Sequence, residues 1–272
     1  MRLSWKLGQV AGIDVYVHAT FLLVFLVFPG VFAGGPLSPL NVLLVFSVFG
    51  CVLLHELGHA IMARHFGIKT HDITLYPIGG VARLERMPRA PGAELLIALA
   101  GPAVNFVLAA ALLPLVFLAG GELASMSVSG VFLEMLLSIN LMLGLFNLIP
   151  AFPMDGGRVL RALLSGWLGR LKATVIAAGV GRVLAVCFAA AALLWTQNPM
   201  QIALAAFIYF AAQGEEAQVR FEERRRRFPV DGQGIWTAPP GQHWVHRGNG
   251  FWQLAPITIR FGDSNRTSSP WG

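Results

Sequence analysis

The sequence of 272 residues carries little charge, because Asp, Glu, Lys and Arg make up only 12% of it, whereas a soluble domain usually carries about 25%. So few charged side chains cannot cover a soluble surface, which excludes an ordinary cytosolic enzyme, a coiled coil and a disordered chain. Cysteine is also scarce: Cys51 and Cys187 both lie in apolar runs, which excludes a disulfide framework and a thiolate metal cluster. Hydrophobic residues make up 56% and favour a protein that crosses a membrane several times.

Six apolar runs approach the roughly 20 residues that a helix needs to cross a bilayer. They lie near residues 18–33, 40–63, 95–119, 128–149, 175–195 and 199–213. The last run is short, so it either crosses with help from flanking residues or is re-entrant. The sequence therefore predicts an all-α polytopic membrane protein with about six transmembrane helices.

Along the chain, segments that contain lysine and arginine alternate with links that contain neither. The links without either residue are 34–39, 120–127 and 196–198, and the basic segments are 64–94, 150–174 and 220–227. Because basic loops stay on the cytoplasmic side, we expect a cell-membrane protein with both termini in the cytoplasm. Arg182 is an exception inside an apolar run, and we expect it to snorkel or to face the bundle interior.

Three polar or Gly-broken segments have features of β-structure. Residues 7–18 alternate weakly, residues 73–87 look extended around Gly79–Gly80, and residues 243–254 contain a Gly-Asn-Gly turn. We expect short β-hairpin segments at the cytoplasmic membrane surface. In the second segment Val81 and Arg83 should project from one face, and the alternate residues from the other.

The predicted domains are an N-terminal surface hairpin at 1–17, a transmembrane domain at 18–218 and a basic, Trp-containing cytoplasmic tail at 219–272. The arginine run at 224–227 is typical of an orientation signal that also attracts anionic lipid. A nucleic-acid partner is not expected, because no folded basic surface accompanies this run.

A metal-binding motif ends the second apolar run, where residues 55–59 are His-Glu-Leu-Gly-His. Histidines four residues apart share one face of a helix, and Glu56 adjoins the first of them. This spacing holds zinc with two neutral imidazoles and leaves a carboxylate free to take a proton from water. Incidental histidines are the alternative, but three ionisable side chains there are unfavourable unless they are paired or bound to a metal.

Two histidines do not complete a catalytic zinc site, which typically takes three protein ligands. His65 and His71 follow in a basic loop and fit poorly. Asp155 is the better candidate, because it lies among prolines and glycines that break the fourth run, and the predicted orientation puts it at the same bilayer face as the motif. The alternative is that Asp155 merely caps a helix starting near Arg158.

The sequence resembles the site-2 protease family of intramembrane zinc metalloproteases, peptidase family M50. The resemblance rests on residues 55–59 and on NLIPAFPMDGG at 147–157, which is similar to the family's N-x-x-P-x-x-P-x-D-G signature with Met154 in place of the more usual leucine. The stretches 79–82 and 97–105 support it, and it covers about residues 8–218.

The resemblance implies an enzyme that hydrolyses peptide bonds of membrane-embedded substrate segments. It implies one Zn²⁺ per chain, held by His55, His59 and Asp155, with Glu56 as the general base that activates water. The expected partners are a membrane-spanning protein or peptide substrate and the lipid bilayer.

The resemblance also implies residues that bind the substrate. Asn147 and Pro150 match the part of the signature that shapes the substrate groove, although Asn147 is alternatively a helix–helix hydrogen-bonding residue. We expect interhelical hydrogen bonds for Asn105 and Asn140, and small-residue packing for Cys51.

An unwound substrate can be held by addition to an exposed strand. The candidate is the segment 79–84, with Gly79, Gly80 and Val81 as contact residues. The alternative is an ordinary cytoplasmic turn.

A non-enzymatic function is the competing interpretation, namely a membrane transporter or a metal-binding scaffold whose His and Asp residues line an ion path. An inverted-repeat transporter should have matching broken helices in its two halves. Here only the run near 147–157 is broken, so the sequence favours the enzyme.

Overall fold

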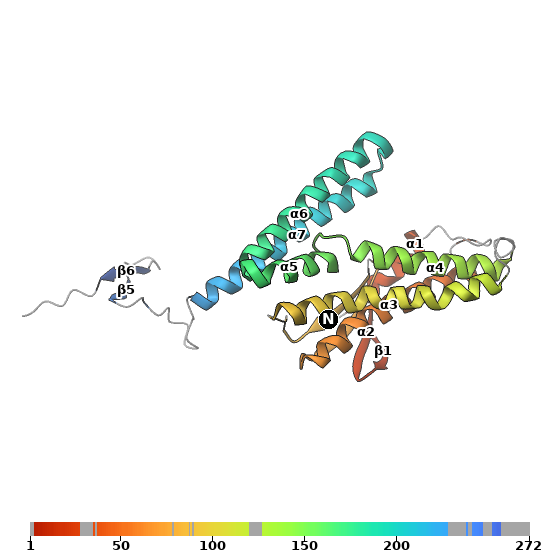
Figure 1. Cartoon of the computed structure of the whole chain (residues 1–272), viewed down its shortest axis with the longest axis horizontal. Coiled ribbons are helices and arrows are strands. Elements are labelled where there is room, and N and C mark those ends of the chain that lie inside the picture. Colours follow the sequence, from red (N-terminus) through yellow and green to blue (C-terminus); the bar gives the residue numbers. More distant parts are fainter. Residues whose placement is uncertain are drawn as a thin grey trace, which may run out of the picture. The chain divides into compact units, whose positions relative to one another are not determined.

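The computed structural model describes residues 3–27, 35, 37–77, 79–86, 88, 90–119, 127–227, 238, 241–246 and 252–256 (Figure 1). The chain divides into two compact units, Met1–Ala217 and Gln218–Gly272. The helical elements are η1 (Ala19–Leu23), α1 (Val24–Val27), α2 (Pro39–His65), α3 (Pro91–Leu118), α4 (Val128–Asn147), α5 (Asp155–Leu168), α6 (Arg170–Ala191), η3 (Ala192–Thr196) and α7 (Pro199–Arg227). The strands are β1 (Ser4–Val10), β2 (Ile13–His18), β3 (Thr70–Tyr76), β4 (Gly79–Leu84), β5 (Gln242–His246) and β6 (Trp252–Pro256).

Among the described residues, four helices are long and apolar enough to cross a membrane: α2, α3, α4 and α6 with its continuation η3. They confirm the predicted runs at 40–63, 95–119, 128–149 and 175–195. The described part of the run at 18–33 forms η1 and the short α1, and the rest lies outside the described residues. The run at 199–213 lies in α7, which continues as one helix to Arg227 and is not among the four.

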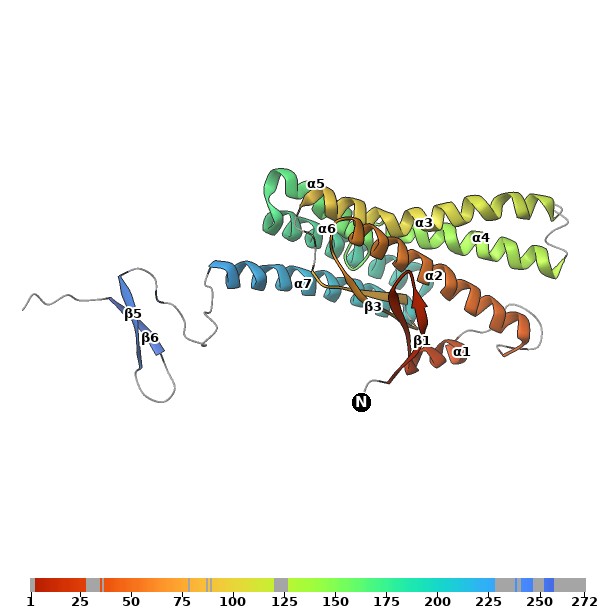
Figure 2. The same ribbon diagram turned by 90° about the horizontal axis from the view of Figure 1, so that it is seen from below.

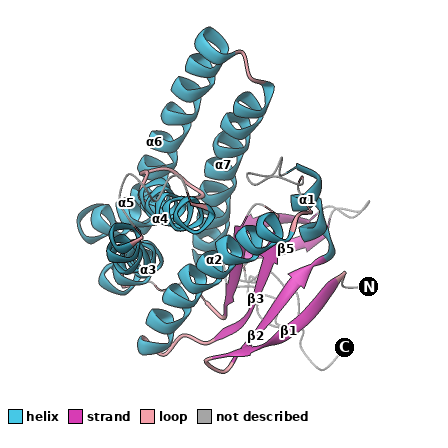
Figure 3. Cartoon of the chain, turned by 90° about the vertical axis from the view of Figure 1, so that its right-hand side faces the viewer, coloured by secondary structure: helices cyan, strands magenta, loops and turns pink. Residues whose placement is uncertain are grey.

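A four-stranded sheet of order β1-β2-β3-β4 packs on α2 (Figure 3). The β1–β2 hairpin turns at Ala11 and Gly12, which both have positive φ, and β3–β4 forms a second antiparallel hairpin. Both predicted extended segments are thus strands. Their union in one sheet was not predicted, because it depends on parallel pairing of β2 with β3. Parallel strands need a crossover connection, and the membrane helix α2 lies in that connection.

This connection positions the sheet beside the metal-binding motif. Only residues 66–69 separate the end of α2 from β3, so the sheet lies against the last turns of α2. Ile73 and Ala82 pack with Ala60 of α2 in one apolar cluster. Val81 and Arg83 line a cavity on the other face of the sheet, which confirms the predicted alternation.

Helix α3 runs beside both α2 and α4 (Figure 2). Its approach to α2 is close, because a Cβ atom on Gly58 would lie 2.8 Å from the Ala100 carbonyl oxygen. Small residues allow membrane helices to approach in this way.

The irregular segment 148–154 joins α4 to α5 and is tightly packed. A Cβ atom on Gly156 would lie 2.2 Å from the Ile149 carbonyl oxygen, so the Asp-Gly-Gly sequence allows the chain to turn onto α5. Phe152, which precedes a cis peptide bond to Pro153, packs with Ala177 of α6 and with Ala212 of α7.

Helices α6 and α7 run side by side (Figure 1). The Arg182 Nη1 atom lies 2.9 Å from the Glu216 Oε2 atom of α7, so this arginine faces a neighbouring helix of the bundle, one of its two predicted positions.

In the second unit, β5 and β6 pair antiparallel, with Trp244 opposite Leu254. This confirms the predicted hairpin in 243–254, whose Gly-Asn-Gly turn lies outside the described residues.

Candidate metal centre

The three predicted ligands come together in a buried cluster. The Nε2 atoms of His55 and His59 are 3.1 Å apart, and the Asp155 Oδ2 atom lies 3.2 Å from the first and 3.1 Å from the second. A tetrahedral zinc ion with bonds of about 2.0–2.1 Å separates its ligand atoms by roughly 3.3 Å. The triangle therefore has the dimensions of three ligand positions of a tetrahedral zinc site. The fourth position of such a site would be left for water or substrate.

The hydrogen bonds of the Nδ1 atoms of the two histidines leave their Nε2 atoms to face the cluster. His55 donates from Nδ1 to the Asn105 Oδ1 atom at 2.5 Å, and His59 donates from Nδ1 to the Ile97 carbonyl oxygen at 2.6 Å. Both acceptors belong to α3. A proton on Nδ1 leaves a lone pair on Nε2, so two lone pairs and a carboxylate face one another, which a shared cation stabilises.

Asn105 also donates to the Asn140 Oδ1 atom of α4 at 3.1 Å, which confirms the predicted interhelical hydrogen bond. Its contact with the His55 ring was not predicted. Cys51 is buried and accepts a hydrogen bond from Asn140 at 3.3 Å, as expected of a packing residue outside the cluster. His65 is exposed.

Asp155 is the first residue of α5, and Met154 occupies the capping position. The alternative that Asp155 caps a helix starting near Arg158 is therefore wrong. The carboxylate projects instead toward the two histidine rings.

Glu56 lies against strand β4. Its Oε2 atom accepts a hydrogen bond of 3.3 Å from the Ala82 backbone N–H, and a Cβ atom on Gly80 would lie 2.6 Å from the Glu56 Cγ atom. Since β4 ends the strand order of its sheet, the backbone edge that faces Glu56 is not paired with another described strand. Glycine at position 80 makes this close approach of carboxylate and strand possible.

Asn147 ends α4, and its side-chain amide donates to the Leu143 carbonyl oxygen at 2.9 Å. In the described part of the chain, no hydrogen bond joins Asn147 to the three ligands. Pro150 is exposed in the turn that follows.

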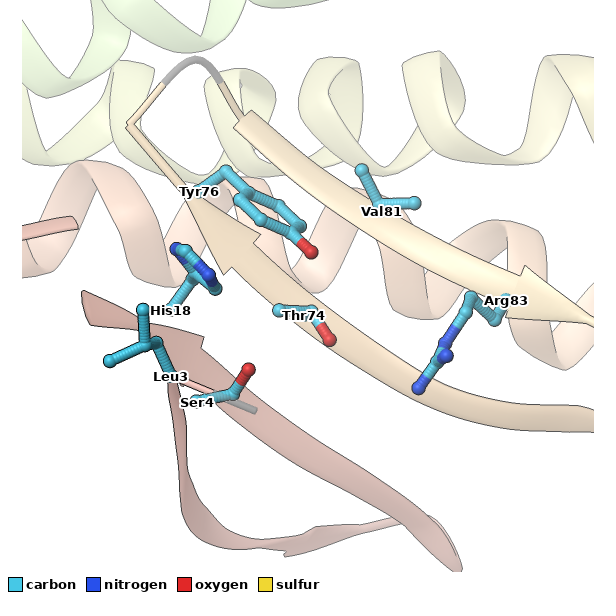
Figure 4. A pocket seen from close by; sticks show the side chains of 7 residues that line it. All are labelled: Leu3, Ser4, His18, Thr74, Tyr76, Val81 and Arg83. Atoms are coloured by element: carbon cyan, nitrogen blue, oxygen red, sulfur yellow. The ribbon is translucent and has the colours of Figure 1, made fainter. Parts of the chain in front are cut away.

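A cavity of about 280 Å³ lies on the face of the sheet away from Glu56 (Figure 4). The rings of His18 and Tyr76 stack in it, with centroids 5.1 Å apart. Arg83 donates to the Asp72 carboxylate, and this hydrogen bond raises the pKa of the Arg83 guanidinium. The lining residues are Leu3, Ser4, His18, Thr74, Tyr76, Val81 and Arg83. The cavity contains none of the three ligands and is separate from the metal centre.

Known proteins are similar to this chain. The profile of peptidase family M50 matches residues 43–131 and 116–190. A zinc metalloprotease of Methanocaldococcus jannaschii is 41% identical over 228 residues, which cover 82% of this chain and 63% of that protein. The protein Rip3 of Mycobacterium tuberculosis is 37% identical over 202 residues, which cover 68% of this chain and 50% of Rip3. The chain thus spans between half and about two thirds of the length of these relatives.

A solved structure entitled Site-2 Protease from Methanocaldococcus jannaschii is 40% identical to this chain, with a TM-score of 0.57. The match covers 78% of this chain and 95% of that one.

Proposed function

Because the chain belongs to peptidase family M50, the site-2 protease family, we propose that it is an intramembrane zinc metalloprotease. The proposed reaction is hydrolysis of peptide bonds in membrane-embedded segments of proteins or peptides. The observation that carries the proposal is the buried triangle of His55, His59 and Asp155, with the Glu56 carboxylate on the same helix as the histidines. A transporter or scaffold would not need a carboxylate placed beside the metal ligands, so it is not favoured.

The residues of the centre divide the chemistry among them. His55, His59 and Asp155 would hold one zinc ion per chain, which would lower the pKa of its water to about 7 and polarise the scissile carbonyl. Glu56 takes a proton from the attacking water at its carboxylate and delivers it to the leaving amine. The Ala82 N–H, which donates to this carboxylate, orients it.

Strand β4 is the proposed binding site for an unwound substrate segment. Its backbone edge beside Glu56 is available for strand addition. Gly79, where a Cβ atom would meet nothing within 4 Å, leaves space for a second backbone, and Gly80 lets the Glu56 side chain lie against the strand. Val81, on the other face of the sheet, would contact alternate substrate side chains. Asn147 and Pro150 are proposed to shape the groove at the end of α4.

We also propose six membrane crossings, with both termini in the cytoplasm. The support is the distribution of Lys and Arg, which places the basic segments 64–94, 150–174 and 220–227 on one side. In this arrangement the hairpin at 1–17 lies at the cytoplasmic surface, and the tail at 219–272 is cytoplasmic.

Removal of zinc tests the reaction class. The purified chain should contain one zinc ion per molecule, because the centre provides three ligands for one ion. Dialysis against a chelator should abolish hydrolysis of a purified single-span substrate, and one equivalent of zinc should restore it. Metal content is measured by mass spectrometry and hydrolysis by gel electrophoresis. A zinc-free sample that retains full activity would contradict the proposal.

The substitution Ala82→Pro tests the backbone donor of β4 at the site, which orients Glu56 and lies on the edge proposed for strand addition. The Ala82 N–H points away from β3 toward Glu56, so a proline there leaves the β3–β4 ladder intact. Loss of this one donor should lower the rate of substrate cleavage about tenfold, as expected for a hydrogen bond of about 1.4 kcal/mol. Initial rates are measured with the substrate reconstituted in lipid vesicles.

The matched control is Val10→Ala in β1, at the opposite edge of the sheet, which should change the rate less than twofold. Val81→Pro should lower both cleavage and the melting temperature, because successive N–H groups alternate in direction and this one points to β3. Unchanged cleavage by a folded Ala82→Pro variant would refute the strand as a binding element.

A further inference from the structure

A second buried cluster of charges lies close to the metal centre and has no part in the proposed reaction. Arg161 of α5 is fully buried, with 0% of its side chain exposed. Its Nε atom donates to the Glu94 Oε1 atom of α3 at 2.7 Å, and its Nη1 atom donates to the Glu215 Oε1 atom of α7 at 2.9 Å. Its guanidinium carbon lies 5.1 Å from the centroid of the Phe152 ring. This one side chain of α5 thus contacts two other helices, α3 and α7, and the segment that precedes Asp155.

The elements that Arg161 joins are the two halves of the metal centre. Helix α3 begins with Glu94 in its first turn and then supplies the acceptors for both histidine rings, Ile97 and Asn105. Helix α5 begins with the third ligand, Asp155. The contact between Arg161 and Glu94 therefore connects the helix that orients the histidines to the helix that carries the aspartate.

We propose that Arg161 is a positioning residue that holds Asp155 within bonding distance of the histidine pair and so determines the zinc affinity of the centre. This inference rests on the proposed function. A metal site needs its ligand atoms held within about 0.5 Å, and Asp155 is the ligand that comes from a different helix. The contacts with Glu94 and Phe152 restrain α5 and the preceding segment at once.

Arginine suits this position better than lysine. Its planar guanidinium donates in two directions while its face lies on an aromatic ring, whereas the lysine ammonium is a point charge on a flexible stem. Arg161→Lys therefore keeps the positive charge that Glu94 needs in a buried site but loses the geometry.

The chain offers a matched control in Arg182. It forms an ion pair with Glu216 at 2.9 Å, the same length as the pair between Arg161 and Glu215, although the Arg182 side chain is partly exposed. That pair joins α6 to α7, and neither helix carries a zinc ligand. Arg182→Lys thus repeats the same chemical change at a pair that does not connect the two halves of the centre.

The experiment measures zinc affinity of the purified full-length chain by competition with a chromophoric chelator. Arg161→Lys should lower the affinity by about 10–100-fold, the loss typical of changes around a metal's ligands, and Arg182→Lys should leave it within twofold. In the cobalt-substituted protein, Arg161→Lys should alter the visible absorption bands, which report coordination geometry. Melting temperatures without metal show whether each variant is folded.

If Arg161→Lys does not fold, Glu94→Gln replaces it, because the amide keeps a hydrogen-bond acceptor and should lower zinc affinity in the same direction. Unchanged affinity in a folded variant overturns the inference, and so does an equal loss in Arg182→Lys. A wild-type chain that binds no zinc overturns the proposed function and this inference with it. If the wild-type chain binds zinc and Arg161→Lys binds it equally tightly, the positioning role alone is overturned and the proposed function stands.

Discussion

Glu56→Gln should lower peptide-bond hydrolysis by about 10²–10⁴-fold, the contribution typical of a positioned general base. The amide has the shape of the carboxylate and accepts the hydrogen bond from the Ala82 N–H through its oxygen, but it does not take a proton from water. Because the proposed zinc ligands are three other side chains, the variant should contain as much zinc as the wild type. Initial rates with a reconstituted substrate and zinc per chain are measured on the same samples.

Glu85→Gln is the control for this change, since Glu85 is exposed just after β4 and should leave the rate unaltered. A transporter or a scaffold would largely retain its function in Glu56→Gln. Hydrolysis within tenfold of the wild-type rate would refute Glu56 as the general base. In cells, single-span membrane proteins that accumulate with Glu56→Gln but not with Glu85→Gln are the candidate substrates.

The cluster of His55, His59 and Asp155 could be predicted because most of the information that specifies it is local. Two histidines four residues apart lie on one helix face wherever that helix packs. Asp155 is distant in sequence, but it follows an abrupt break in an apolar run, and the charge distribution put both segments at one bilayer face. The four helices that are long and apolar enough to cross a membrane follow in the same way from the length and composition of single runs.

What could not be predicted depends on contacts between distant segments. The parallel pairing of β2 with β3 across α2 leaves no local pattern, yet it brings β4 to Glu56. The Ala82 donor is a backbone N–H, which every residue except proline has. Arg161 was counted among the basic residues of segment 150–174 that predict orientation, whereas the structure buries it completely. A charge count does not distinguish a solvated arginine from one enclosed between helices.

Gly101→Ala should strongly weaken zinc binding, because the centre depends on the close approach of α3 to the two histidine rings. A Cβ atom at this position of α3 would lie 2.2 Å from the His59 Nε2 atom and 2.7 Å from the His55 Nε2 atom, well inside van der Waals contact. The methyl group would therefore displace both ring nitrogens from the position of the ion. We expect zinc affinity to fall by at least about 100-fold, the upper end of losses from changes around the ligands, as measured by chelator competition.

Gly92→Ala is the control in the same helix, because a Cβ atom there would meet nothing within 4 Å, and it should bind zinc like the wild type. Both variants should keep the helices that circular dichroism measures, since alanine favours a helix more than glycine does. Gly101 contributes no ligand atom, so a selective loss of zinc in Gly101→Ala would be a steric effect at the ring nitrogens. If Gly101→Ala instead binds zinc with wild-type affinity, the metal does not lie between these nitrogens and the assignment of the centre is wrong.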